Sequence, residues 1–304
     1  MSRPSQVARS AGRLGRDVST TSRILYHLGA GDGAALAWYL RQMLTPDEQT
    51  TLGVAMLARD DVAFSFDAGG FHWLIPSGDD IPTSMLVNGE YGGGEVTAVT
   101  TWIREFRPSN ASVVIEVGAN VGTTTMPMVA QGWRVIALEP VPKTFEYLVT
   151  NIAANDVGDS VEVFPLAVAP DVGTVDMVVS HSLGRSHLEG FGHGDVGDHV
   201  SVNALPLDEV VERSRYSLDD VAWVWCDTNG SERHVIESGA RLWERGIPLF
   251  AEIGPDFGVE NVAANHFRGF VPEHDLGTSS EPRPISEFGR FVRGLQVLEN
   301  VLLV

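Results

Sequence analysis

Cysteine is almost absent from this chain of 304 residues, in which Cys226 is the only one. A single cysteine excludes a disulfide within the chain and favours a reducing compartment, so we expect a cytoplasmic protein. Long apolar runs are absent too, since no stretch reaches the roughly 18 residues of a membrane-spanning helix. Residues 1–25 also lack the apolar core of a secretory signal. The sequence therefore predicts no membrane span.

Basic residues are few. Lys and Arg number 21 against 40 Asp and Glu, which gives a net charge of −19. Nucleic acids and anionic membranes are bound through clustered Lys and Arg. The composition therefore argues against both as partners, and a small-molecule ligand is the better expectation.

The chain divides into an N-terminal part and a larger α/β part. Residues 1–22, basic and rich in Arg, Ser and Gly, are expected to be disordered. Residues 23–83 predict a cap made of amphipathic helices and a hairpin that turns at the glycine pair 69–70. The apolar face of these helices is a candidate surface for a homodimer. Residues 84–304 carry the α/β pattern and form the predicted catalytic domain.

A glycine-containing turn organises the α/β part. Residues 113–117 are mostly apolar and predict a buried strand, which ends in the turn G-A-N-V-G-T at 118–123. Glycine permits a sharp turn and a close backbone approach. A helical segment and a second strand (133–138) follow, and the strand ends at Glu139. This order predicts one βαβ unit of a nucleotide-binding fold, although a turn that merely closes an α/β unit would have the same pattern.

Two acidic residues beside the turn indicate its ligand. Glu139 lies 23 residues after Glu116, near the spacing at which a carboxylate meets a ribose diol. A dinucleotide site needs glycine where Asn120 stands, so that a pyrophosphate can lie against the backbone. Glu116 would repel a pyrophosphate and suits an ammonium group. The pattern favours S-adenosylmethionine (SAM), which has an ammonium, a ribose diol and no phosphate, over NAD.

Four ordered motifs resemble the FkbM family of class I SAM-dependent methyltransferases. They are EVGANVG (116–122), ALEPVPKTFEYLVTNIAAN (137–155), PLAVAPDVG (165–173) and VWCDTNGSERHVIESGA (224–240). The resemblance implies an α/β fold with a Rossmann-like, seven-stranded sheet of order 3-2-1-4-5-7-6. It also implies SAM as cofactor and O-methylation of a hydroxyl on a sugar or polyketide-like natural product.

The same resemblance assigns residues to the cofactor. Tyr91 and Glu95 are the nearest matches to an element that borders the cofactor, and Leu166 and Ala167 would line the adenine. Core packing is an equal alternative for Tyr91, Leu166 and Ala167. The remaining cofactor candidates lie at the ends of the predicted strands: Glu116, Gly118, Ala119, Asn120, Gly122, Thr123, Glu139, Pro140, Val141 and Asp227.

Two residues are candidates for catalysis. Asp227 follows the predicted buried strand 221–226, and ligands of open α/β sheets bind beyond the carboxyl ends of the strands. The structural alternative for Asp227 is an N-cap of the next helix. His187 lies in the glycine-rich stretch 178–199, which predicts a loop, and an imidazole suits a general base near neutral pH. The histidines of this stretch match no finger-like metal pattern, so no metal is expected.

Two other functions stay open. A nicotinamide-dependent oxidoreductase can use the same architecture, although Asn120 and Glu116 weigh against it. A catalytically silent SAM-binding partner protein would keep the turn and both acids without turnover.

Overall fold

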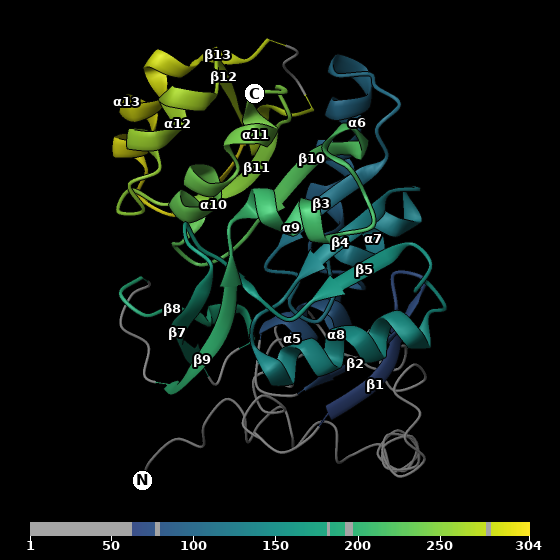
Figure 1. The fold of residues 1–304 in the computed structure, drawn as a ribbon. Helices are drawn as coiled ribbons and strands as arrows, with labels where there is room; N and C mark the ends of the chain where they lie inside the picture. The colour runs from purple at the N-terminus through teal and green to yellow at the C-terminus, as the bar shows by residue number, and fades with distance from the viewer. Residues whose placement is uncertain (1–62, 77–79, 181–182, 192–196, 278–280) are drawn as a thin grey trace, which may run out of the picture. The chain divides into compact units, whose positions relative to one another are not determined.

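The computed structural model describes residues 63–76, 80–180, 183–191, 197–277 and 281–304 (Figure 1). The basic N-terminus and the predicted cap helices lie outside these residues. The chain splits into two compact units, which divide after Tyr91. No helix in the described ranges has the length and apolar character needed to cross a membrane.

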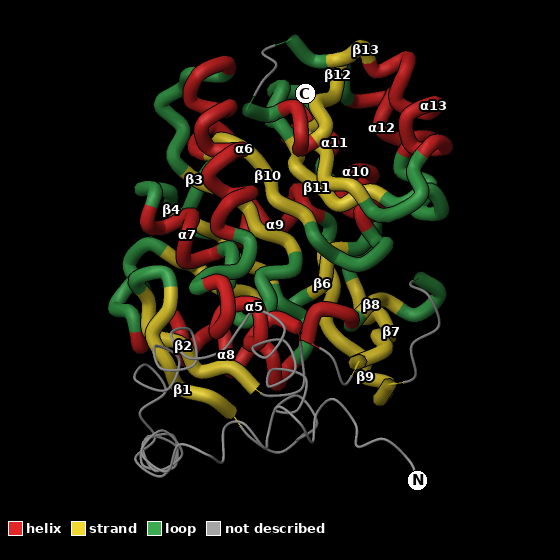
Figure 2. Tube along the Cα trace, turned by 180° about the vertical axis from the view of Figure 1, so that it is seen from behind, coloured by secondary structure: helices red, strands yellow, loops and turns green. Residues whose placement is uncertain are grey.

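The described helices and strands alternate along most of the chain, with short 3-10 turns between them (Figure 2). In chain order they are β1 (Ala63–Ala68), β2 (Phe71–Pro76), α5 (Asp80–Asn88), α6 (Gly93–Phe106), β3 (Val113–Val117), α7 (Thr125–Ala130), β4 (Arg134–Leu138), α8 (Pro142–Ala154), β5 (Val161–Phe164), β6 (Ala167–Val168), β7 (Gly173–Ser180), β8 (His187–Leu188), β9 (Gly197–Leu205), α9 (Leu207–Arg213), β10 (Val221–Cys226), α10 (Glu232–Ser238), α11 (Ala240–Trp243), β11 (Leu249–Ile253), α12 (Glu260–His266), β12 (Gly269–Pro272), β13 (Arg283–Pro284), α13 (Phe288–Gly294) and β14 (Glu299–Leu303).

The N-terminal unit contains the predicted hairpin. β1 and β2 pair antiparallel, from Ala63 opposite Pro76 to Ala68 opposite Phe71. Gly69 and Gly70 form the turn with φ of 60° and 85°, a conformation that favours glycine at both positions. The hairpin part of the predicted cap is therefore confirmed.

The larger unit is built on a mixed sheet of eight strands, in the order β13-β12-β14-β11-β10-β3-β4-β5. Strands β5, β4, β3, β10 and β11 are parallel, and β14 runs antiparallel to β11 and β12. When the two-residue β13 is left out and the other seven strands of this sheet are numbered in chain order, they read 3-2-1-4-5-7-6 from the β5 edge. β13 adds an eighth strand at the opposite edge. The predicted count of seven is therefore too low by one.

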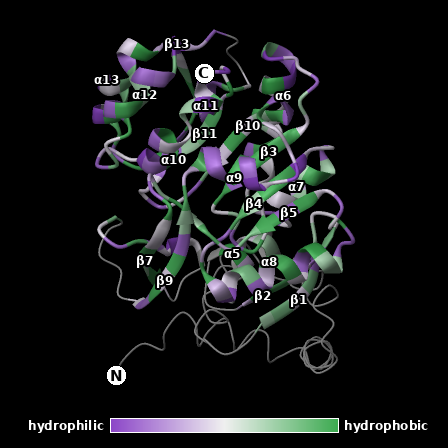
Figure 3. Ribbon diagram, in the orientation of Figure 1, coloured by the Kyte–Doolittle hydropathy of each residue, from purple (hydrophilic) through white to green (hydrophobic). Residues whose placement is uncertain are grey.

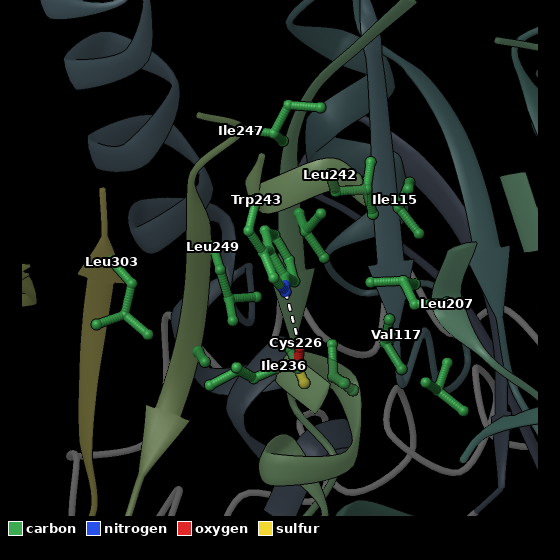
Figure 4. Packing of buried hydrophobic residues seen from close by; sticks show 14 of the residues in the cluster. Ile115, Val117, Leu207, Cys226, Ile236, Leu242, Trp243, Ile247, Leu249 and Leu303 are labelled. Carbon is green, nitrogen blue, oxygen red and sulfur yellow. Dashed lines mark hydrogen bonds between the residues drawn. The ribbon is translucent and has the colours of Figure 1, made fainter. Parts of the chain in front are cut away.

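Both faces of this sheet are covered, which explains why its strands are apolar almost throughout. On one face a hydrophobic core joins the sheet to α9, α10, α11, α12 and α13, and the central strands are coloured hydrophobic in Figure 3. Figure 4 shows part of this core, in which the Trp243 indole N–H donates to the carbonyl of Ile236 at 2.8 Å. On the other face Trp133 packs edge-on against Trp223 of β10 and donates its N–H to Thr100 of α6.

A second sheet of four strands, in the order β6-β9-β7-β8, was not predicted. β7 and β9 pair antiparallel over eight residue pairs, from Gly173 opposite Ala204 to Ser180 opposite Gly197. The prediction of a loop over 178–199 is therefore wrong for residues 178–180, 187–188 and 197–199, which are in strands. Glycine and polar residues between these short strands hid them. A small core of its own, which includes Met177, Leu188 and Val202, holds this sheet together.

Candidate active site

The turn after β3 is shaped by backbone conformations that few residues adopt. Gly118, Asn120 and Gly122 have φ of 90°, 51° and 97°. A Cβ on Gly118 would lie 1.9 Å from the carbonyl oxygen of Asp227, so only glycine fits there. The backbone N–H of Asp227 in turn donates to the carbonyl of Val117 at 3.0 Å. The glycine turn therefore holds the predicted catalytic aspartate directly beside the predicted cofactor turn.

Glu116, near the end of β3, is fully buried. Its two carboxylate oxygens accept hydrogen bonds from the hydroxyl groups of Thr124 and Thr125, the second at 2.5 Å. Burial raises the pKa of Glu116 to about 7, although these hydrogen bonds lower it. The carboxyl group therefore ties β3 to the start of α7, close to the buried Thr123.

Glu139 follows β4 and accepts hydrogen bonds from the turn after β3 and from the start of the next segment. Its Oε2 accepts from the N–H of Asn120 at 3.0 Å, and its Oε1 accepts from the N–H of Val141 at 2.8 Å. Burial raises the pKa of this carboxyl group to about 7. A carboxylate offers about four acceptor sites. Roughly one site on each oxygen of Glu139 is thus left for a ligand such as a ribose diol.

The other predicted cofactor residues fall into three places. Ala119 and Val141 are buried in or beside the turn, and Pro140 is half-buried between Glu139 and α8. Leu166 belongs to the main core and Ala167 to the small core of the second sheet. Packing therefore accounts for part of the burial of these two side chains.

Tyr91 and Glu95, near the start of the predicted domain, have fewer contacts that connect them to the turn. Tyr91 is the last residue of the N-terminal unit and is 41% exposed. Glu95 lies in the first turn of α6, and its charge acts on Glu273. A Cβ on Gly92, just before α6, would lie 2.6 Å from the Thr124 methyl group. The start of α6, which carries Glu95, therefore lies against Thr124, a residue that follows the turn.

Asp227 is the first residue after β10, and its side chain is exposed. Desolvation by the surrounding protein nevertheless raises the pKa of Asp227 to about 6. The alternative role of an N-cap is wrong, because α10 begins only at Glu232 with Ser231 at its N-cap position. The carboxyl group of Asp227 is therefore not used to start the helix.

Glu232 shapes the loop after Asp227 and was missed as a site residue. Its Oε1 accepts from the N–H and hydroxyl of Thr228 at 3.0 and 2.8 Å, and from the N–H of Gly230 at 3.2 Å. Its Oε2 is buried and has no hydrogen-bond partner among the described residues. Burial raises the pKa of Glu232 to about 7. An acid shortly after Asp227 within the same motif was the available signal.

Residues beside β8 contact both this loop and α10. The side-chain N–H of Asn229 donates to the carbonyl of Ser186 at 3.1 Å, and the ring of Phe191 packs edge-on against His234 at 4.9 Å. His187, next to Ser186, is buried and donates from Nδ1 to the carbonyl of Arg185 at 3.0 Å. A neutral ring with its proton on Nδ1 has an acceptor at Nε2. The contacts thus bring the segment of His187 to the segment of Asp227.

Glu252 is a further carboxyl group at this edge that the sequence reading missed. It lies on β11, is half-buried, and follows Ala251, which pairs with Cys226. Burial first, and then the charges of Asp227 and Glu232, raise the pKa of Glu252 to about 8. An acid within an otherwise apolar run, residues 248–253, was the signal for it.

The residues at the carboxyl ends of β3, β4 and β10 indicate the class of protein. A glycine turn after one parallel strand, an acid after the next and an aspartate beyond a third are typical of nucleotide-type cofactor sites in α/β enzymes. The model of the methyltransferase FkbM domain matches residues 116–276, just over half of the 304 residues. The chain belongs to this methyltransferase family, and the resemblance seen in its motifs is confirmed.

Solved structures resemble the chain only distantly. The methyltransferase FkbM from Methylobacillus flagellatus is 11% identical with a TM-score of 0.41, over 84% of this chain and 59% of that one. The O-methyltransferase from Bacillus cereus, solved with SAH, is 15% identical with a TM-score of 0.37, over 89% and 96%. A 16S rRNA methyltransferase from T. thermophilus is 12% identical with a TM-score of 0.40, over 80% and 50%. No curated protein matches the chain.

Proposed function

We propose that the protein is a SAM-dependent O-methyltransferase that acts on a hydroxyl of a small molecule, a sugar or a polyketide-like compound. The observation that carries this proposal is the packing of Gly118 against the carbonyl oxygen of Asp227. It sets a candidate base beside a candidate cofactor turn at one edge of the sheet. Family membership favours methyl transfer over the nicotinamide-dependent alternative.

The residues around the turn fit SAM better than a dinucleotide. Glu139 keeps acceptor sites for the ribose diol after its two backbone hydrogen bonds. Glu116 and Glu139 have no ion-pair partner within the described parts of the chain, so a pyrophosphate would add repulsion here. When bound, SAM supplies a methyl group already activated by its sulfonium charge. We further propose that Leu166 and Ala167 lie against the adenine, and that Tyr91 and Glu95 border the site.

Asp227 is the proposed general base. With a pKa of about 6 it is mostly ionised at pH 7 and yet more basic than an ordinary aspartate, as proton removal from a hydroxyl requires. His187 is the second candidate, since its Nδ1 donates to a backbone carbonyl and its Nε2 is not used in that bond. An acceptor without phosphate groups fits the net charge of −19 better than a nucleic acid does.

Calorimetric titration with SAM, SAH and NAD tests the cofactor. We expect micromolar binding of SAM and SAH, no comparable binding of NAD, and at least about tenfold weaker SAM binding to Glu139→Ala, which loses two acceptors for the diol. Glu146→Ala, on an exposed position of α8, is the matched control and should bind SAM like the wild type. Wild-type protein that does not bind SAM would overturn the proposal.

Formation of SAH over a panel of hydroxylated acceptors tests catalysis. For Asp227→Asn we expect SAM binding close to wild type and turnover lowered by about 10²- to 10⁴-fold, the usual share of a general base. Full turnover of this variant would remove Asp227 from catalysis and leave His187. SAM binding without transfer to any acceptor of the panel would instead favour a catalytically silent protein.

A further inference from the structure

Glu252 and Asp227 occupy equivalent positions on neighbouring parallel strands. β10 and β11 pair in register from Val224 opposite Leu249 to Cys226 opposite Ala251, so the next positions are Asp227 and Glu252. Neighbouring strands lie about 4.8 Å apart, and paired residues point to the same face of a sheet. The two carboxyl groups therefore emerge side by side at the edge where we place methyl transfer.

In the described parts of the chain, the groups that interact with this pair supply no compensating positive charge. Glu116 from β3, Glu232 from α10 and the buried thiol of Cys226 all interact electrostatically with one or both carboxyl groups, and each is neutral or negative. Among the described residues neither Asp227 nor Glu252 forms an ion pair. Asn300, opposite Glu252 on β14, gives its side-chain N–H to Glu273 instead.

Two adjacent carboxyl groups without a cation resist double ionisation, because the second charge would be desolvated and repelled by the first. We propose that Glu252 is a positioning residue for methyl transfer, which stays protonated at neutral pH so that an ionised Asp227 can stand beside it as the base. This inference rests on the proposed function. It explains why an acid interrupts the otherwise apolar strand β11.

The proposed step balances as follows. The acceptor O–H bond breaks and its proton goes to the carboxylate of Asp227, while the acceptor oxygen gains the methyl group and the sulfonium becomes a neutral thioether. Glu252 neither gains nor loses a proton in the step. Both carboxyl groups of the pair are then protonated, and Asp227 must release its proton to solvent before the next turnover.

The pair can be tested without an acceptor, by following the side-chain ¹³C signals of Asp227 by NMR as pH rises. In the wild type we expect two inflections, one near pH 6 from Asp227 itself and one near pH 8 from its neighbour. Glu252→Gln keeps the shape of the side chain and should abolish only the upper inflection. Glu273→Gln is the matched control, since Glu273 is a partly buried acid whose charged neighbours are Glu95, Glu299 and His274. An upper inflection that persists in Glu252→Gln would overturn the pairing.

Turnover with an acceptor from the panel tests the positioning role. We expect the wild-type rate to fall about tenfold per pH unit on both sides of its optimum, below pH 6 and above pH 8. Glu252→Gln should keep the acid limb and lose the alkaline limb. An alkaline limb that is unchanged in Glu252→Gln would refute the role of Glu252. Turnover by the wild type would in that case still support the proposed function. Failure of the wild type to bind SAM in calorimetry would instead refute the function and leave the NMR result to stand alone.

Discussion

The buried carboxyl group of Glu116 makes the stability of the protein depend on pH in a direction that is easy to measure. Its pKa is raised from 4.5 to about 7 by burial, so folding favours the protonated form. The stabilising contribution of the group is complete below pH 4.5 and is lost as pH rises through 7. Glu116→Gln removes this titration and keeps a side chain of the same shape between Thr124 and Thr125.

The size of the effect follows from the two pKa values. This difference between the two pKa values corresponds to about 3 kcal/mol, most of which is lost between pH 5 and pH 8. The free energy of unfolding of Glu116→Gln, minus that of the wild type, should therefore rise by about 2–3 kcal/mol over this range. For a unit of this size that is a relative gain of about 5–10 °C in Tm.

Urea denaturation at pH 5, 6, 7 and 8 measures this difference, and any constant cost of the substitution cancels from it. Glu146→Gln, an exposed acid on α8, provides the control and should follow the wild type at every pH. A difference between Glu116→Gln and the wild type that stays the same from pH 5 to pH 8 would refute the reasoning. It would mean that the two threonine hydroxyls keep Glu116 ionised in spite of its burial.

Two further predictions concern the turn and the loop beside it. Gly118→Ala should destabilise the protein by about 3 kcal/mol or more in urea and abolish SAM binding, because it adds left-handed strain to a 1.9 Å clash with Asp227. Gly132→Ala, with a similar φ of 87° and open space around its Cβ, should cost only about 1–2 kcal/mol, and equal losses for both variants would contradict this view. Asn229→Gly keeps a left-handed backbone and loses the bond to Ser186, so amide exchange at His187 should quicken by about three- to tenfold, whereas unchanged exchange would show that the contact does not hold the second sheet.

Much of the fold was predictable because its signals are local. Residues 113–117 and 221–226 form strands with the predicted bounds, since an apolar run between polar residues needs no knowledge of its partners. The second sheet was not predictable in this way. β8 has two residues, and β7 gains its partner β9 only by pairing Gly173 with Ala204, far along the chain. Such pairings are decided by tertiary packing rather than by local pattern.

The candidate site shows the same division. Glu139 and Asp227 were found because each follows a predicted strand, and the carboxyl ends of parallel strands meet at one edge of a sheet. Glu252 was missed because its meaning depends on which strand lies next to β10. Because β11 takes that place, the acid in this apolar strand lies at the position next to the proposed base on the neighbouring strand.

The number of buried acids is itself an argument about function. Glu116, Glu139 and Glu232 are buried, and with Asp227 and Glu252 they all have raised pKa values, so each costs stability at neutral pH. Hydrogen bonds to threonine hydroxyls and backbone N–H groups explain three of them as parts of the turn and loop. They do not explain Asp227 and Glu252, for which no hydrogen bond of this kind is seen among the described residues. Two acids with raised pKa values at neighbouring strand ends lower the stability of the fold. Such groups are typical of catalytic sites, so we infer that Asp227 and Glu252 serve the reaction.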